Sequence, residues 1–231
     1  MTAAVLRVQD LHWSKPGANG GLPGTPVLRG AGLEVHAGEL VALEGASGTG
    51  KTVLCTHLLR LREPPQKGSI FWGDQDVTGW PHRRLRPLRR AFQGMLQHTG
   101  AILPPFLTVG DALRETARYV ARTPDPERLV HEMVQALGIQ RLLPRRPRHL
   151  SGGEQRLAGL ARILLNQPDF AFFDEPDAGL DPPSQLEILR QIRRAAEVGG
   201  TGILLVTHNA GLARQHADRR LRLQEGRIHA I

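Results

Sequence analysis

The segment GASGTGKT, residues 45–52, places a glycine, four residues, a second glycine, a lysine and a hydroxyl in succession. Glycines free backbone N–H groups to turn around phosphate oxygens, and the start of a following helix adds partial positive charge. We expect Lys51 to bridge the β- and γ-phosphates of a nucleotide and Thr52 to bind Mg²⁺. The predicted phosphate-binding loop consists of Gly45, Ala46, Ser47, Gly48, Thr49, Gly50, Lys51, Thr52 and Val53.

An apolar run, FAFFDEP, ends in two adjacent acids, Asp174 and Glu175. We expect Asp174, at the end of a strand, to join the Mg²⁺ site at the same sheet edge as the phosphate loop. Glu175 points differently, and its expected task is to orient or deprotonate the attacking water. Paired acids after a strand often only cap a helix, but the nearby phosphate loop makes that alternative the weaker one.

The heptapeptide LSGGEQR, residues 150–156, has two interpretations that are compatible. Ser151 and Glu154, three residues apart, have the spacing of a capping box at a helix start. The adjacent Gly152 and Gly153 also permit close approach of the backbone to a phosphate, to which the helix start offers N–H donors. The segment therefore predicts a capped helix that could bind an anion.

The elements that must position these residues begin with short alternating stretches at 5–11, 27–35 and 70–72, which predict antiparallel strands. Residues 40–45 read as a buried strand that enters the phosphate loop. Residues 51–61 have the apolar spacing of a helix. A strand, a glycine loop and a helix are thus expected in succession.

After residue 97 the sequence pattern changes from that of short strands to that of helices. Thr108 and Asp111 have capping-box spacing, and the segment PERLVHEMVQALG ends at Gly138 as helices often do. This part predicts a helical lobe. Expected strands at 170–173 and 203–206 alternate with helices from Ser151 and from about Pro183, which indicates a parallel sheet covered by helices.

Composition fits a globular protein of 231 residues, 40% hydrophobic and 23% charged. No apolar run approaches the roughly 20 residues that cross a bilayer. Arg7 and Asp10 interrupt the place where a signal peptide needs its apolar stretch. The single cysteine, Cys55, is expected to be a packed hydrophobe in a reducing cytosol rather than a reactive thiol.

The net charge of +8 arises from 27 arginines and only three lysines. The densest cluster lacks the interleaved aromatic residues that stack on bases, so we favour a solvated face over a site for nucleic acid or anionic headgroups. This cluster consists of Arg83, Arg84, Arg86, Arg89 and Arg90.

The motifs, in their order, resemble those of the ATP-binding cassette (ABC) ATPases along nearly the whole chain. They are GASGTGKT, Gln97, LSGGEQR, FAFFDEP, AGLD and LLVTHN. In that family two cassettes pair head to tail, so the resemblance implies that Ser151 and Gly153 bind the γ-phosphate held by the partner cassette. It further implies that Gln97 is a catalytic and metal-binding residue near Mg²⁺ and the membrane subunit. By the same resemblance, Asp181 lies between the two sites, and His208 is a catalytic residue that senses the γ-phosphate.

The resemblance implies one ABC domain over residues 1–231, with an α/β, P-loop NTPase (RecA-like) fold. Its core with an antiparallel β subdomain would span 1–97 and 151–231, and residues 98–150 would form an inserted α-helical subdomain. The implied function is an ATP-hydrolysing subunit of a membrane transporter, driven by ATP-dependent dimer closure. Implied partners are permease subunits, a second ATPase subunit and, in the full system, a solute-binding protein, at the cytoplasmic face of the membrane. Residues 97–111 resemble importers of the oligopeptide, nickel and phosphonate type.

Departures from the family pattern leave some alternatives open. Lys15 stands where an aromatic residue should stack on adenine, and Trp13, two residues earlier on the same strand face, could substitute or could be ordinary packing. Val53 replaces a second hydroxyl, which costs one phosphate hydrogen bond. The main rival function is a non-transport ABC ATPase in a soluble or nucleic-acid-associated complex, although residues 98–149 are too few for a coiled-coil arm. A regulatory module that holds ATP without cleaving it is more remote.

Overall fold

The computed structural model describes residues 4–16, 24–96, 103–119 and 124–231. Within these residues the strands form two sheets. One is four-stranded and antiparallel, in the order β2-β1-β4-β5, and the other is six-stranded, in the order β10-β9-β3-β8-β7-β6. The antiparallel strands are β1 (Ala4–Lys15), β2 (Thr25–His36), β4 (Lys67–Trp72) and β5 (Gln75–Asp76).

The second sheet is parallel from β9 to β6, and β10 joins its edge antiparallel to β9. Its strands are β3 (Leu40–Glu44), β6 (Phe92–Met95), β7 (Phe170–Asp174), β8 (Gly202–Val206), β9 (Arg219–Gln224) and β10 (Arg227–Ala230). The strands predicted at 40–45, 170–173 and 203–206 are confirmed, with bounds that differ by one residue. The central strands β3, β7 and β8 are buried on both faces, which is what a helix-covered parallel sheet requires.

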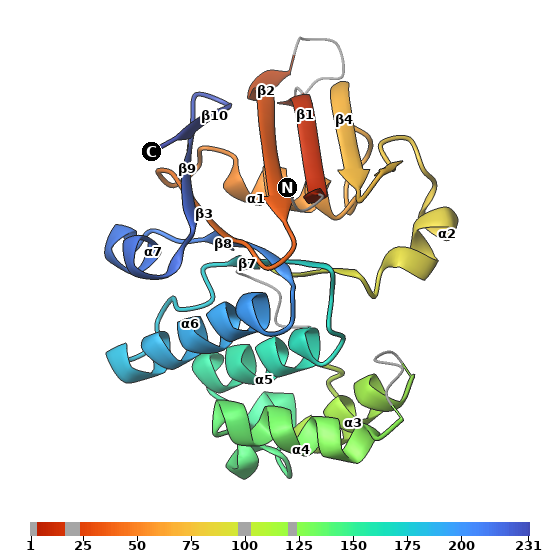
Figure 1. Ribbon diagram of the computed structural model, residues 1–231, viewed down its shortest axis with the longest axis vertical. Helices are drawn as coiled ribbons and strands as arrows, with labels where there is room; N and C mark the ends of the chain where they lie inside the picture. Colours follow the sequence, from red (N-terminus) through yellow and green to blue (C-terminus); the bar gives the residue numbers. More distant parts are fainter. Residues whose placement is uncertain (1–3, 17–23, 97–102, 120–123) are drawn as a thin grey trace.

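Figure 1 shows α1 between the two sheets and α5 and α6 beyond the opposite face of the parallel sheet. The α-helices are α1 (Lys51–Leu58), α2 (His82–Leu85), α3 (Val109–Tyr119), α4 (Pro126–Leu137), α5 (Gly152–Leu164), α6 (Pro182–Glu197) and α7 (Ala210–His216). Short 3₁₀ turns occupy η1 (Arg86–Leu88), η2 (Gln140–Leu142) and η3 (Pro147–His149). The helices α3 and α4 pack on α5 at the end of the molecule away from the antiparallel sheet.

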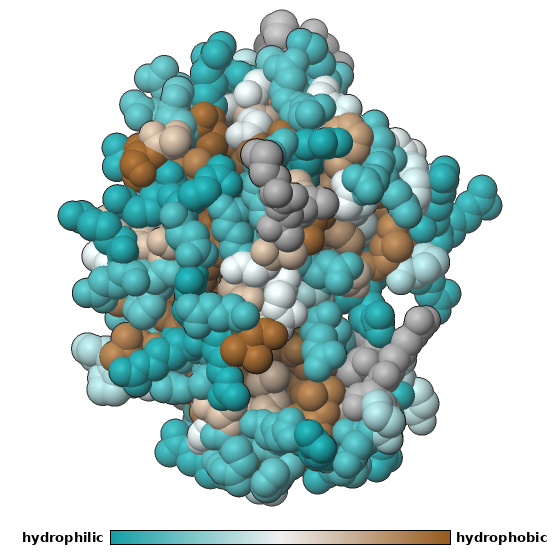
Figure 2. Space-filling view, in the orientation of Figure 1, coloured by the Kyte–Doolittle hydropathy of each residue, from teal (hydrophilic) through white to brown (hydrophobic). Residues whose placement is uncertain are grey.

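The parallel sheet separates two hydrophobic cores. Phe170 and Phe172 of β7 face α1 and the antiparallel sheet, whereas Ala171 and Phe173 face the helices α5 and α6. Because neighbouring side chains of a strand point to opposite faces, one apolar run serves both cores. Outside the cores, Figure 2 shows a mainly hydrophilic face with small, separate hydrophobic patches.

Two helix ends follow local chemistry. The helix α4 begins after Asp125, whose carboxylate accepts the N–H of Arg128 at 3.0 Å, and it ends at Gly138 in the left-handed conformation, as predicted. The helix predicted over 51–61 is too long by three residues. It ends at Leu58, because Arg60 adopts a φ of +51° that no α-helix continues. Among the described helices, none is both long and apolar enough to cross a membrane.

Candidate ATP site

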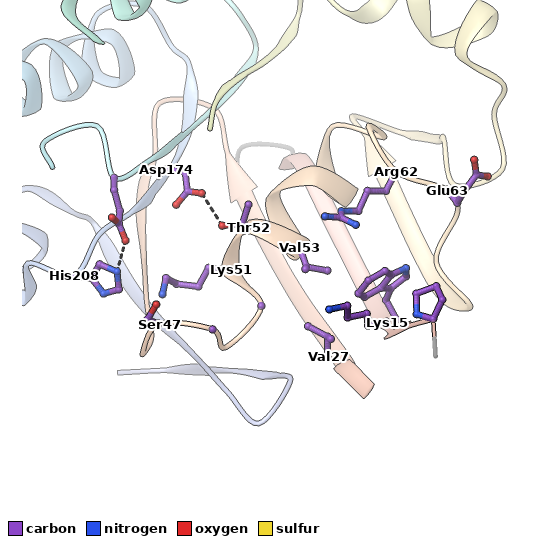
Figure 3. A pocket seen from close by; sticks show the side chains of 15 residues that line it. Lys15, Val27, Ser47, Lys51, Thr52, Val53, Arg62, Glu63, Asp174 and His208 are labelled. Carbon is purple, nitrogen blue, oxygen red and sulfur yellow. Dashed lines mark hydrogen bonds and ion pairs between the residues drawn. The ribbon is translucent and has the colours of Figure 1, made fainter. Parts of the chain in front are cut away.

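The phosphate loop joins β3 to α1 and opens into a cavity of about 750 Å³. Figure 3 shows Lys51, Thr52 and Asp174 at one part of this cavity, and Lys15, Arg62 and Glu63 at another. The lining residues are Trp13, Lys15, Pro16, Val27, Ser47, Gly48, Gly50, Lys51, Thr52, Val53, Arg62, Glu63, Asp174, Glu175 and His208. Gly45, Ala46 and Thr49 line a smaller hollow on the other side of the loop, which His208 shares.

A glycine is required at position 50, directly before α1. Gly50 has a φ of +102°, and a β-carbon there would lie 2.7 Å from the Val27 side chain. The left-handed turn brings the chain from β3 into the start of α1, where the first backbone N–H groups have no partner within the helix. The helix start is therefore available to an anion, as the sequence pattern indicates.

Lys51 is only 6% exposed, although it carries an ammonium group. Its Nζ donates to the carbonyl oxygens of Gly45 at 2.7 Å and Ala46 at 2.9 Å, so the side chain folds back over the loop. Burial lowers the pKa of Lys51, and the nearby carboxylates of Glu175 and Asp174 act in the opposite direction. An anion in the cavity would supply the charge partner that two carbonyl oxygens replace only in part.

Thr52 and Asp174 meet although they are 122 positions apart in the chain. The Thr52 hydroxyl donates to Asp174 Oδ2 at 3.0 Å, and Asp174 is 2% exposed at the end of β7. Burial raises the pKa of Asp174, an effect that the Thr52 hydrogen bond opposes. One hydroxyl and one carboxylate fit Mg²⁺, which takes few protein oxygens and completes its shell with phosphate and water.

His208 Nε2 contacts Glu175 Oε1 at the edge of the same cavity. The Glu175 backbone has a φ of +51°, rare for a side chain of this size, and its N–H donates to the Val206 carbonyl at 2.9 Å. This geometry turns the carboxylate away from the strand direction of β7. The adjacent acids thus have different positions, with Asp174 at Thr52 and Glu175 at His208.

The LSGGEQR segment forms the predicted capping box at the start of α5. Glu154 accepts the N–H of Ser151 at 2.9 Å, and the Ser151 hydroxyl accepts the N–H of Glu154 at 3.3 Å. Arg145 donates to Glu154 at 3.0 Å and holds the carboxylate in place. The exposed Ser151 and Gly152 and the half-buried Gly153 do not line the cavity around Lys51.

The structure describes Asp181 but not Gln97. Asp181 caps α6, since its carboxylate accepts from the N–H of Ser184 at 3.3 Å and from the Ser184 hydroxyl at 2.6 Å. The structure thus gives Asp181 a local partner, and it does not line the cavity. Gln97, predicted as a catalytic and metal-binding residue, lies outside the described residues.

Sequence reasoning did not identify several residues at the cavity. Arg62 and Glu63 come from the loop after α1, and no motif marks them. Asp177 is 7% exposed and shares an adjacent hollow with Glu175 and His208. Burial raises the pKa of Asp177, and the Glu175 charge acts in the same direction. The burial of Asp177 and its place beside Glu175 and His208 depend on contacts in space, so the sequence alone did not indicate them.

Known proteins share this sequence and fold. The family model described as ABC transporter matches residues 28–178. The chain is 33% identical over 230 residues to the lipoprotein-releasing system ATP-binding protein LolD of Pseudomonas fluorescens, covering 99% of this chain and 98% of that protein. It is 36% identical over 212 residues to the L-cystine transport system ATP-binding protein TcyN of Escherichia coli, covering 89% and 83%. It is 33% identical over 204 residues to the macrolide export ATP-binding/permease protein MacB of Nitrobacter winogradskyi, covering 88% of this chain and 31% of that protein.

Solved structures agree with the fold. The dimeric post-hydrolysis form of the ATP-binding cassette MJ0796 superimposes with a TM-score of 0.85 at 22% identity, over 97% of this chain and 96% of that one. A structure described as the ATP binding subunit of an ABC transporter gives a TM-score of 0.81 at 26% identity, over 98% and 90%. The expected P-loop fold with its antiparallel sheet and helical part is confirmed. Motifs, fold and relatives lead to one conclusion: this chain belongs to the ABC transporter family, as an ATP-binding ATPase subunit.

Proposed function

We propose that this chain hydrolyses ATP in a head-to-tail pair of cassettes and thereby drives transport through permease subunits. One observation carries the proposal. Lys51, Thr52, Asp174, Glu175 and His208 gather around one cavity, while Ser151 lies at an exposed helix start outside it. A capped helix start that is lined by two glycines and lies outside its own chain's cavity fits a partner's phosphate.

Each group at the cavity has a separate task in this proposal. Lys51 exchanges the carbonyl oxygens of Gly45 and Ala46 for the β- and γ-phosphates. Thr52 and Asp174 would hold Mg²⁺, which would supply positive charge against the phosphates. Glu175 orients or deprotonates the attacking water, and His208 fixes the Glu175 carboxylate.

The partner's Ser151 and Gly153 complete the γ-phosphate site, and Asp181 lies between the two sites. Electrostatic stabilisation by fixed donors and Lys51 supplies most of the catalysis, because in-line phosphoryl transfer needs little covalent chemistry from the protein. The adenine end of the nucleotide lies toward Trp13, which lines the cavity together with Val53. Gln97 completes the metal site in the proposal, on the strength of the family resemblance.

The partners and the location follow from the same proposal. A second cassette, identical or related, and permease subunits complete the transporter at the cytoplasmic face of the membrane. MacB joins an ATP-binding part and a permease in one protein, which supports this kind of partner. Import of a peptide, nickel or phosphonate cargo with a solute-binding protein stays a prediction, because the relatives are named for lipoprotein release, macrolide export and L-cystine transport.

The proposal is tested by steady-state ATP hydrolysis with purified protein. We expect Mg²⁺-dependent activity that is lost in Lys51→Met, which keeps the length of the side chain but removes its charge. The matched control is Arg83→Met, an exposed arginine of α2 that does not line the cavity. Equal activity in Lys51→Met and in the wild type would refute the proposed phosphate site.

A further inference from the structure

The cavity carries an arginine, Arg62, for which the proposed hydrolysis has no task. Arg62 lies in the loop after α1 and lines the cavity with Trp13 and Glu63. Figure 3 shows its side chain extending into the cavity above Val53. The guanidinium carbon lies 5.3 Å from the centroid of the Trp13 ring, so a cation and an indole meet at this part of the cavity.

Arg62 is tied to the helix that begins at the phosphate loop. Its Nε donates to the Thr56 hydroxyl at 2.7 Å, and this hydroxyl lies 2.9 Å from the carbonyl oxygens of both Thr52 and Val53. A free arginine side chain loses rotamer freedom when it binds a ligand. The tether removes part of that cost in advance, because Arg62 is already held relative to Thr52.

Trp13 is held from a second side by a buried histidine. The rings of Trp13 and His57 meet edge to face, with centroids 5.5 Å apart and an angle of 62°. His57 is 0% exposed, and its Nδ1 lies 2.8 Å from the Val53 carbonyl. The indole and the guanidinium are therefore both fixed to α1.

We propose that Arg62 contacts the base of the bound purine nucleotide directly, beside Trp13, and contributes base-dependent affinity. This inference rests on the proposed function, which places the triphosphate at Lys51 and the base toward Trp13. A planar guanidinium stacks on aromatic rings and hydrogen-bonds to ring nitrogens, whereas an aliphatic side chain would offer only apolar contact. Arg62 is thereby a binding residue for the base, with no part in phosphoryl transfer.

The test separates the base from the phosphates by comparing ATP with inorganic tripolyphosphate. Calorimetric binding to the wild type, Arg62→Met, Arg62→Lys and the control Arg83→Met is measured with Mg²⁺ present. We expect Arg62→Met to bind ATP about fivefold more weakly and tripolyphosphate unchanged. Arg62→Lys, which keeps the charge but not the plane, should recover only part of the ATP affinity, and Arg83→Met should match the wild type.

Three results would overturn the inference. Unchanged ATP affinity in Arg62→Met means that Arg62 makes no contact with the base. An equal loss for ATP and for tripolyphosphate means that the arginine acts on the phosphates or on the loop. If the wild type binds neither ligand, the proposed function fails first, and the inference fails with it.

Discussion

Replacing Asp174 by asparagine should stabilise the nucleotide-free protein. The carboxylate is 2% exposed, accepts the Thr52 hydroxyl at 3.0 Å and has Glu175 as a like-charged neighbour. A folded-state pKa raised by burial means that the ionised form opposes folding at neutral pH. The amide still accepts from Thr52 but carries no charge, so we expect the free energy of unfolding to rise by about 1 kcal/mol.

The same substitution should remove the response to the ligand. In urea unfolding followed by circular dichroism, Mg²⁺ and ATP at about 100 times the dissociation constant should stabilise the wild type by about 2.7 kcal/mol. Asp174→Asn should gain little, because a neutral amide is a poor partner for Mg²⁺. The reasoning is refuted if the variant is less stable than the wild type without nucleotide, or if the ligand stabilises both equally.

Asp218→Asn is a control of opposite sign. Burial alone would raise the pKa of Asp218, but hydrogen bonds from Arg193 at 2.6 Å and from the Leu40 N–H at 2.8 Å outweigh it and lower the pKa. The ionised form therefore stabilises the fold, and its removal should lower the free energy of unfolding. Asp218 does not line the nucleotide cavity, so stabilisation by Mg²⁺ and ATP should be unchanged.

Three further predictions are checked by unfolding, binding and turnover. The stability difference between the wild type and Asp218→Asn should be full above the unfolded pKa of about 3.9 and vanish as the pH falls through the lowered folded-state pKa; a difference that persists in acid would contradict the pairing. Gly94→Ala places a β-carbon 2.4 Å from the buried Phe172 ring and should cost about 1–3 kcal/mol, whereas Gly79→Ala, with nothing within 4 Å, should be tolerated in the same urea titrations. Ser151→Ala should cost about 1 kcal/mol through the lost cap and slow steady-state turnover, while calorimetry on the monomer gives an unchanged ATP affinity; weaker binding would place Ser151 in its own chain's site.

The parts that local sequence could predict are those formed by near neighbours in the chain. The capping box of Ser151 and Glu154 forms with both hydrogen bonds, because its partners are three residues apart. The strand, glycine loop and helix around Lys51 follow in the same way from residues that are contiguous. Alternation in β1 is only partial because the strand has a β-bulge, at which Asp10 adopts a φ of +48°.

The parts that the sequence could not predict depend on contacts between distant segments. The strand β6 contains glycine and glutamine and has no strong strand pattern, and it exists because its backbone pairs with β7. Gly94 is required there only because the Phe172 ring covers it. Arg62 reaches Trp13 across 49 positions of sequence, so no local pattern reveals that the two residues meet at one cavity.

The central claim, that two cassettes share each ATP, is tested most directly by the molar mass of Glu175→Gln with Mg²⁺ and ATP, measured by light scattering during size-exclusion chromatography. We expect this variant to bind ATP but to hydrolyse it slowly, so the closed pair should accumulate as a dimer. Adding Ser151→Ala should return the protein to a monomer, since the partner's helix start then loses its hydroxyl donor to the γ-phosphate. A Glu175→Gln protein that is saturated with ATP and still monomeric would contradict the account.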